Sequence, residues 1–208
     1  TANGEQIGTL TLVIGSTFEG TITAGLDGET VVTLNYPAGV TEVPATQEAK
    51  AGSFANGAAL LEGTTTVADL RKGNAAQLSN KTALLKFVMP ENGEITFYNG
   101  KTKLVSLTGC SAGNTYYACV APNTYDLTYS VNTMESEKQK TATFDENKIY
   151  DLGTLPKFLR LLPNGTWNIS NPRYAAYFFT NTEVWKDMKS HTEGLYYVEI
   201  PEGQEDVI

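Results

Sequence analysis

Apolar and polar residues alternate with a period of two along much of this chain. Because successive side chains of a β-strand point to opposite faces, each alternating set predicts a strand with one apolar face. The sets are Leu10, Leu12 and Ile14; Val32 and Leu34; Leu85, Phe87 and Met89; Ile95 and Phe97; Leu127, Tyr129 and Val131; and Ala142 and Phe144.

Short turn signals separate these predicted strands and favour hairpins over helical crossovers. They are Asp27-Gly28, Pro37-Ala38-Gly39, Glu91-Asn92-Gly93, Asn99-Gly100 and Ala112-Gly113-Asn114. Only residues 58–62 and 67–78 are compatible with a helix, and Gly73 weakens the second stretch. The pattern therefore predicts an all-β fold, a mainly antiparallel β-sandwich with at most one or two helical turns.

A domain boundary is predicted near Leu155-Pro156-Lys157, because proline disfavours continuation of a β ladder and both tryptophans follow this point. We expect a first domain of residues 1–157 and a smaller β-sandwich segment of residues 158–208, with strands at 159–162, 174–179 and 196–200. The last residues, Asp206-Val207-Ile208, resemble the beginning of a strand. We therefore expect the second segment to be truncated at its C-terminus.

Composition narrows the classes of function. The 208 residues are 41% hydrophobic and carry 15 basic and 23 acidic side chains, a net charge of -8, which gives no electrostatic basis for binding nucleic acid. No apolar run approaches the roughly 18 residues that cross a bilayer, so no transmembrane segment is predicted. Abundant Thr, Gly, Asn, Tyr and Val are typical of an exported all-β protein.

The two cysteines, Cys110 and Cys119, flank a predicted hairpin with its turn at Ala112-Gly113. That turn places Cys110 opposite residue 115 or 116 and not opposite Cys119. Since bridged cysteines have Cα atoms about 4.4–6.8 Å apart, we expect one turn cysteine and one core cysteine, without a disulfide.

The sequence contains few residues in patterns typical of catalytic or metal-binding sites. A single histidine, His191, excludes a multi-histidine zinc site and leaves almost nothing for a serine triad. Asp27-Gly28-Glu29 and Asp145-Glu146-Asn147 lack the spacing of a calcium loop, and no carboxylate pair lies in a recognisable catalytic motif. We predict a non-enzymatic protein without a metal or cofactor.

Residues 1–157 resemble the fimbrillin-like surface proteins of Gram-negative gut and oral anaerobes. The resemblance implies a transthyretin-like β-sandwich, export as an outer-membrane lipoprotein anchored upstream of residue 1, and a fimbrial or pilus-type role in cell adhesion. Its partners would be other pilin-like subunits, joined by strand donation. Leu85, Phe87, Tyr117 and Ile149 are expected to face inward. The matching pieces are Val43 to Gln47, Ala51 to Phe54, Ala58 to Leu60, Asn80 to Phe87, Thr115 to Pro122 and Phe144 to Gly153.

Residues 158–208 resemble small carbohydrate-binding modules of the starch-binding type. The residues that carry this resemblance are Leu161 to Pro163, Trp167, Arg173 to Phe178, Trp185, Met188 and Gly194 to Tyr196. It implies a platform for a host or dietary polysaccharide, with Trp167, Tyr174, Tyr177 and Trp185 as the candidate binding residues. Flat aromatic faces suit this role because the apolar face of a sugar ring gains dispersion and desolvation energy on them.

Alternation divides the aromatic strand into two faces but does not show which one is buried. Tyr174, Ala176 and Phe178 share one face, while Tyr177 and Phe179 share the other. Two functions follow from the whole sequence. The first is a cell-surface adhesion protein, a fimbrial subunit or accessory; the alternative is a surface glycan-binding protein whose first domain serves as a spacer.

Overall fold

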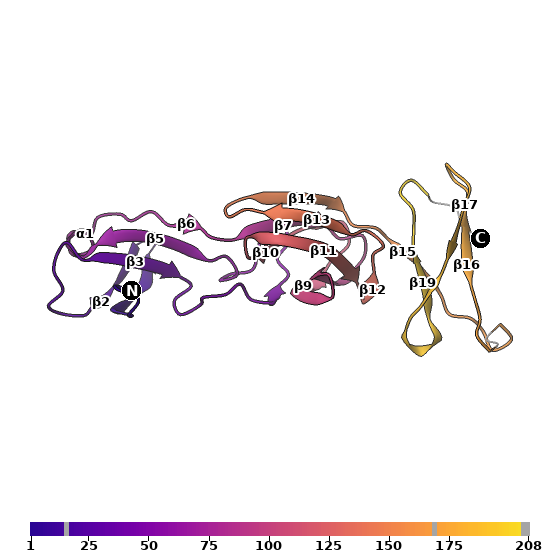
Figure 1. Ribbon diagram of the computed structural model, residues 1–208, viewed down its shortest axis with the longest axis horizontal. Coiled ribbons are helices and arrows are strands. Elements are labelled where there is room, and N and C mark those ends of the chain that lie inside the picture. The colour runs from indigo at the N-terminus through magenta and orange to yellow at the C-terminus, as the bar shows by residue number, and fades with distance from the viewer. Residues whose placement is uncertain (15–16, 168–169, 205–208) are drawn as a thin grey trace.

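The computed structural model of the protein describes residues 1–14, 17–167 and 170–204. It is all-β and mostly antiparallel, as the alternation predicted. Three groups of strands follow one another along an elongated molecule, with the N-terminus in the first group (Figure 1). Residues 206–208, expected to begin a strand, lie outside the described residues.

The first group contains two small sheets and the helix. β1 (Gly8–Ile14) pairs with β2 (Thr17–Ile22), and β3 (Val31–Tyr36) pairs with β5 (Leu61–Thr66), which also pairs with β6 (Ser79–Asn80). In β3, Val32 is buried as expected. The side chains of Leu12 and Ile14 lie outside the described part of the chain.

The helix α1 (Val67–Lys72) is shorter than the predicted stretch, and residues 58–62 form no helix. The hydroxyl of Thr66 accepts a hydrogen bond from the Asp69 backbone N–H and caps the start of the helix. Gly73 adopts a left-handed conformation with φ 71°, so the helix ends there. Residues 61–66 instead continue as β5, because strand pairing with β3 outweighs a weak helical preference.

The second group is a β-sandwich. One sheet has the strand order β12-β11-β8-β9-β4 with β13 paired to β11, and the other has the order β10-β7-β14. The pairs β4–β9 and β7–β14 are parallel, and the rest are antiparallel. The bounds are β4 Thr46–Glu48, β7 Ala83–Val88, β8 Gly93–Asn99, β9 Thr102–Cys110, β10 Thr115–Val120, β11 Asn123–Val131, β12 Met134–Glu135, β13 Lys140–Phe144 and β14 Ile149–Thr154.

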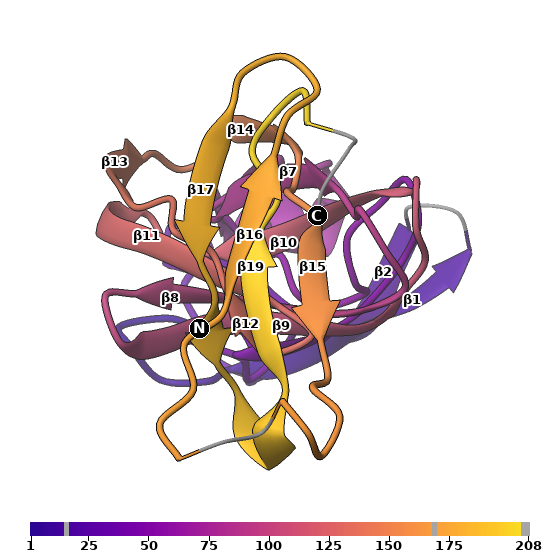
Figure 2. The same cartoon turned by 90° about the vertical axis from the view of Figure 1, so that its right-hand side faces the viewer.

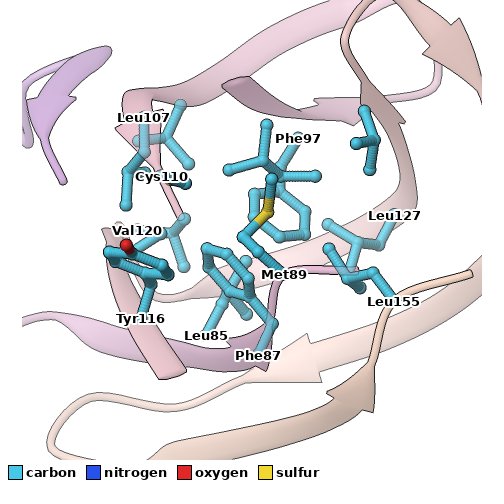
Figure 3. Packing of buried hydrophobic residues seen from close by; sticks show 14 of the residues in the cluster. Leu85, Phe87, Met89, Phe97, Leu107, Cys110, Tyr116, Val120, Leu127 and Leu155 are labelled. Atoms are coloured by element: carbon cyan, nitrogen blue, oxygen red, sulfur yellow. The ribbon is translucent and has the colours of Figure 1, made fainter. Parts of the chain in front are cut away.

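The core of the sandwich lies between the two sheets (Figure 3). Leu85, Phe87 and Met89 from one side and Ile95 and Phe97 from the other are completely buried, which confirms the alternation in both strands. The rings of Phe87 and Phe97 meet edge to face with their centroids 5.3 Å apart. These residues therefore fix which face of each sheet points inward.

The predicted inward orientation of Tyr117 and Ile149 is wrong. Tyr117 pairs with Lys86, and Ile149 pairs with Leu84, so both share the face of β7 opposite to Phe87. Directly paired residues of neighbouring strands point to the same side of a sheet. Ile149 is accordingly 59% exposed on the outer face of the edge strand β14, and Tyr117 is half-buried.

Of the five predicted turns, only Asn99-Gly100 joins two paired strands, β8 and β9. Glu91-Asn92-Gly93 and Ala112-Gly113-Asn114 instead carry the chain from one sheet of the sandwich to the other. Cys110 and Cys119 therefore lie on strands of different sheets, and the predicted hairpin between them is wrong. Both thiols are free, as expected, and both are buried.

The third group packs a two-stranded hairpin against a three-stranded sheet. The hairpin is β16–β17, and the sheet has the order β15-β19-β18. Ala176 and Phe178 of the hairpin and Val198 of the sheet are buried between them. The bounds are β15 Phe158–Leu161, β16 Ala175–Phe178, β17 Val184–Asp187, β18 Lys189–Ser190, η1 Thr192–Gly194 and β19 Tyr196–Glu199.

The joint between the second and third groups is packed. Leu155, Phe158 and Tyr197 belong to the core of the sandwich, although Phe158 and Tyr197 come from β15 and β19. The buried carboxylate of Glu199 accepts hydrogen bonds from the Ser136 hydroxyl at 2.8 Å and from the Glu137 backbone N–H at 2.9 Å. The predicted division at residue 157 thus separates two sets of strands that share one hydrophobic cluster.

Candidate functional site

The candidate site lies on the β16–β17 hairpin at the far end of the molecule, where the hairpin faces the viewer in Figure 2. One face of the hairpin is buried through Ala176 and Phe178. The opposite face carries Tyr177 and Trp185, which pair directly across the two strands. The structure therefore selects the Tyr177 face as the outer one, a choice that the alternation left open.

Three aromatic side chains form a stack on this outer face. Tyr177 lies between the other two: its ring centroid is 4.9 Å from that of Trp185 and 5.8 Å from that of Phe179. The ring planes are inclined by only 29° and 24°, so neighbouring rings cover each other's faces. We call Phe179, Tyr177 and Trp185 the aromatic stack.

The members of the aromatic stack are not equally accessible. Trp185 is 69% exposed and Phe179 is 40% exposed, whereas Tyr177 is half-buried. Because Tyr177 covers one face of the indole, the exposed surface of Trp185 includes its other face. Trp185 is therefore the ring that offers a face to a ligand, and Tyr177 holds it in place.

Charged side chains lie beside the aromatic stack. Glu183 and Asp187 flank Trp185 at alternate positions, which places them on its side of the chain. Asp187 accepts a hydrogen bond from the Arg173 guanidinium at 2.9 Å. Desolvation, and then the hydrogen bond of the Tyr177 hydroxyl with the Glu183 carboxylate, raise the pKa of Tyr177. The surroundings thus provide both donors and acceptors for sugar hydroxyl groups.

The other two predicted residues, Trp167 and Tyr174, lie elsewhere. Tyr174 is half-buried with its ring edge to face with Tyr196 at 4.6 Å, and its hydroxyl donates to the Trp167 carbonyl at 2.6 Å. With Met188 they line a separate cleft of about 230 Å³. The four predicted residues therefore form two pairs and not one platform. Tyr174 and Tyr177 are three positions apart, so their side chains point to opposite faces of the chain.

Phe179 was missed as a member of the site. A phenylalanine has no polar group and is usually buried, but the structure exposes Phe179 beside Tyr177. The alternation had already placed Phe179 on the Tyr177 face. That periodicity was the better signal, because the position of a residue on a short hairpin depends on its face more than on its polarity.

A larger cleft of about 500 Å³ lies on the sandwich beside the segment that follows β3. Val43, Pro122 and Tyr125 contribute to its lining, together with the charged Glu42 and Lys81. The ammonium of Lys81 already pairs with the Glu146 carboxylate at 3.3 Å. Nothing in this cleft was predicted from the sequence, and its lining includes no histidine, cysteine or serine.

Within residues 1–14, 17–167 and 170–204, no three side chains of histidine, cysteine, aspartate or glutamate gather as metal ligands would. His191 instead shares a hydrogen bond with the Thr133 hydroxyl at 2.9 Å. In the same part of the chain, no helix is long and apolar enough to span a membrane.

Comparisons with protein-family models, curated proteins and solved structures found no match to this chain.

Proposed function

We propose that this chain is a non-enzymatic cell-surface adhesion protein that binds polysaccharide through the aromatic stack. The observation that carries the proposal is the 69% exposure of Trp185, a large apolar side chain supported from behind by Tyr177. Exposed aromatic surface of this kind marks binding sites more often than ordinary surface. Export and an anchor upstream of residue 1 belong to the same proposal and rest on the fimbrillin resemblance.

The stack suits sugar binding for two physical reasons. Stacking against Tyr177 restricts the rotation of the indole before any ligand arrives, so little conformational entropy is lost on binding. The apolar face of a pyranose then gains dispersion energy on the free face of Trp185. Glu183, Asp187 and Arg173 lie beside the ring and bond the hydroxyl groups that project from the edge of the sugar.

The test is substitution of Trp185 by alanine, with retention in native gels that contain dissolved polysaccharides as the measurement. We expect Trp185→Ala to abolish retention while the melting temperature changes little, because the exposed ring contributes little to the core. Trp167→Ala is the matched control, since it removes the other exposed tryptophan and leaves the aromatic stack intact. A wild-type protein that no polysaccharide retards, or loss of retention only with Trp167→Ala, would contradict the proposal.

A second candidate function, assembly as a pilus-type subunit, is favoured by the β1–β2 hairpin. Among the described residues, these two strands pair only with each other, and they expose Val13 by 57% and Phe18 by 42%. Unpaired strand edges with apolar side chains are suited to pairing with another chain. If the hairpin mediates assembly, Val13→Asp should reduce concentration-dependent association in sedimentation experiments, whereas Val31→Asp on β3 should not. A protein that stays monomeric at all concentrations would argue against this role.

A further inference from the structure

We infer that the aromatic stack accepts neutral sugar rings and disfavours anionic ones, and that Glu183 sets this preference. The inference rests on the proposed polysaccharide-binding function and adds the class of ligand to it. It is drawn from the charges that surround Trp185 and from the way in which the three rings cover one another.

The two carboxylates beside Trp185 differ in their partners. Asp187 is neutralised by Arg173, whose guanidinium nitrogen lies 2.9 Å from the carboxylate oxygen. Within the part of the chain that the structure describes, no lysine, arginine or histidine forms an ion pair with Glu183. Glu183 is therefore the carboxylate beside the aromatic stack whose charge no described basic side chain compensates.

Glu183 is well placed to meet the edge of a ring that stacks on Trp185. Glu183 directly precedes β17, and because Val184 pairs with Phe178, the next positions outward on the hairpin are Phe179 and Glu183. The Glu183 side chain is exposed, so its carboxylate oxygens are open to hydrogen-bond donors from a ligand. Sugar hydroxyl groups supply such donors, so a neutral hexose satisfies both the ring face and the carboxylate.

An anionic sugar meets the opposite situation. A uronic acid carboxylate or a sulfate group offers only acceptors, which cannot bond to an ionised Glu183 and are repelled by its charge. The net charge of -8 over the whole chain acts in the same direction at low ionic strength. The surroundings of Trp185 therefore oppose an anionic ligand at short and long range.

The ring geometry also argues against a cationic ligand in an aromatic cage. Such a cage needs several ring faces that point to one position. Here Tyr177 lies between Phe179 and Trp185, and the small interplanar angles turn ring faces toward each other and not toward a shared space. A single free indole face fits a flat sugar ring better than an ammonium group.

The experiment compares the wild type with Glu183→Gln in native gels that contain soluble starch, mixed-linkage β-glucan, polygalacturonate or hyaluronan. We expect at least one neutral polymer to retain the wild type, and neither anionic polymer to do so. In Glu183→Gln, the ratio of neutral to anionic binding should fall by about fivefold, the effect of one exposed charge. Glu62→Gln is the matched control, because it removes the same charge from an exposed position on β5.

The possible failures of this experiment are distinguishable. If no polymer retards the wild type, the proposed polysaccharide-binding function is wrong. If polygalacturonate is bound as well as the neutral glucans and Trp185→Ala abolishes both, the function stands and the charge preference is wrong. If Glu183→Gln and Glu62→Gln change the ratio equally, Glu183 does not set the preference. Retention on a choline resin that depends on Trp185 would overturn the choice of a sugar over a cation.

Discussion

Phe87 and Lys86 are neighbours on β7 but have opposite surroundings. Phe87 is completely buried against Phe97 and Tyr116, whereas the Lys86 ammonium reaches the Asp151 carboxylate on the outer face at 2.6 Å. We expect Phe87→Ala to lower the free energy of unfolding by about 3–5 kcal/mol, the usual cost of emptying a buried phenylalanine site. Lys86→Ala should cost much less, because exposed ion pairs are weak. If urea denaturation showed equal losses of unfolding free energy for the two variants, the assignment of the inner and outer faces of β7 would be wrong.

The cysteines provide a second prediction at the scale of single residues. Burial raises the pKa of the Cys110 thiol to about 11 and that of the Cys119 thiol to about 12. Since the thiolate is the reactive form, neither thiol should react with a disulfide reagent in the native protein at pH 8, and both should react after unfolding. Rapid labelling of either thiol in the native state would contradict this expectation.

The same two groups give the protein a pH dependence of known sign. Between pH 9 and the raised values, the folded chain holds protons that the unfolded chain has released, so stability falls as the pH rises through this range. Burial also raises the pKa of Tyr129 to about 12, which extends the effect. The urea midpoint should therefore be lower at pH 10.5 than at pH 8, and an unchanged midpoint would count against burial of these groups.

At the scale of elements, the crossing from β7 to β8 depends on one glycine. Gly93 has φ 143°, and a Cβ atom added there would lie 1.7 Å from the side-chain oxygen of Asn132. That oxygen accepts a hydrogen bond from the Glu94 backbone N–H at 2.9 Å, and the Asn132 amide nitrogen donates to Glu91. Gly93→Ala must displace this side chain and break its bonds.

We expect Gly93→Ala to destabilise the protein by more than Gly113→Ala, which serves as the control. Gly113 also has a positive φ, of 76°, but a Cβ atom there meets open space. Gly113→Ala should therefore cost only the conformational strain of about 1–2 kcal/mol, while Gly93→Ala adds the lost hydrogen bonds. Thermal melts of both variants measure the difference, and equal shifts would show that Asn132 moves aside without cost.

The elements also show how far the sequence was informative. Alternation in residues 85–89 and 95–97 predicted the buried face of the sandwich, because a strand has only two faces. The turn signals, in contrast, gave the wrong role to Glu91-Asn92-Gly93, since a short loop with glycine can form either a hairpin or a crossing between two sheets. The candidate site was predictable to the same extent. Alternation placed Tyr177 and Phe179 on one face, but the pairing of Tyr177 with Trp185 depends on the β16–β17 register, which no local pattern specifies.

At the scale of the whole molecule, the third group of strands is attached to the sandwich by polar contacts around residues 133–137. Glu199 binds Ser136 and Glu137, His191 binds Thr133, and Lys186 pairs with Glu137 at 2.6 Å. The orientation of the aromatic stack relative to the sandwich therefore depends on the Glu199 carboxylate, the buried member of this set.

We expect Glu199→Ala to loosen this attachment without unfolding the sandwich. The substitution leaves the Ser136 hydroxyl and the Glu137 N–H without their acceptor, at a cost of about 1–3 kcal/mol where water cannot replace it. Hydrogen exchange in β15 and β19 should accelerate, while exchange in β7 and β8 stays slow. Glu202→Ala, at an exposed position, is the control. Unchanged exchange in all four strands would show that the apolar contacts of Phe158 and Tyr197 are sufficient.

The direction of the strands has a mechanical consequence for the adhesive role proposed above. Figure 1 shows β3, β5, β7, β13 and β14 running along the long axis, whereas β15, β16, β17 and β19 run across it. A pull along that axis shears the hydrogen bonds between the lengthwise strands together, but it peels the crossing strands apart one bond at a time. We therefore expect the segment that carries Trp185 to unfold under tension before the lengthwise strands do, and its unfolding to limit the force that reaches them.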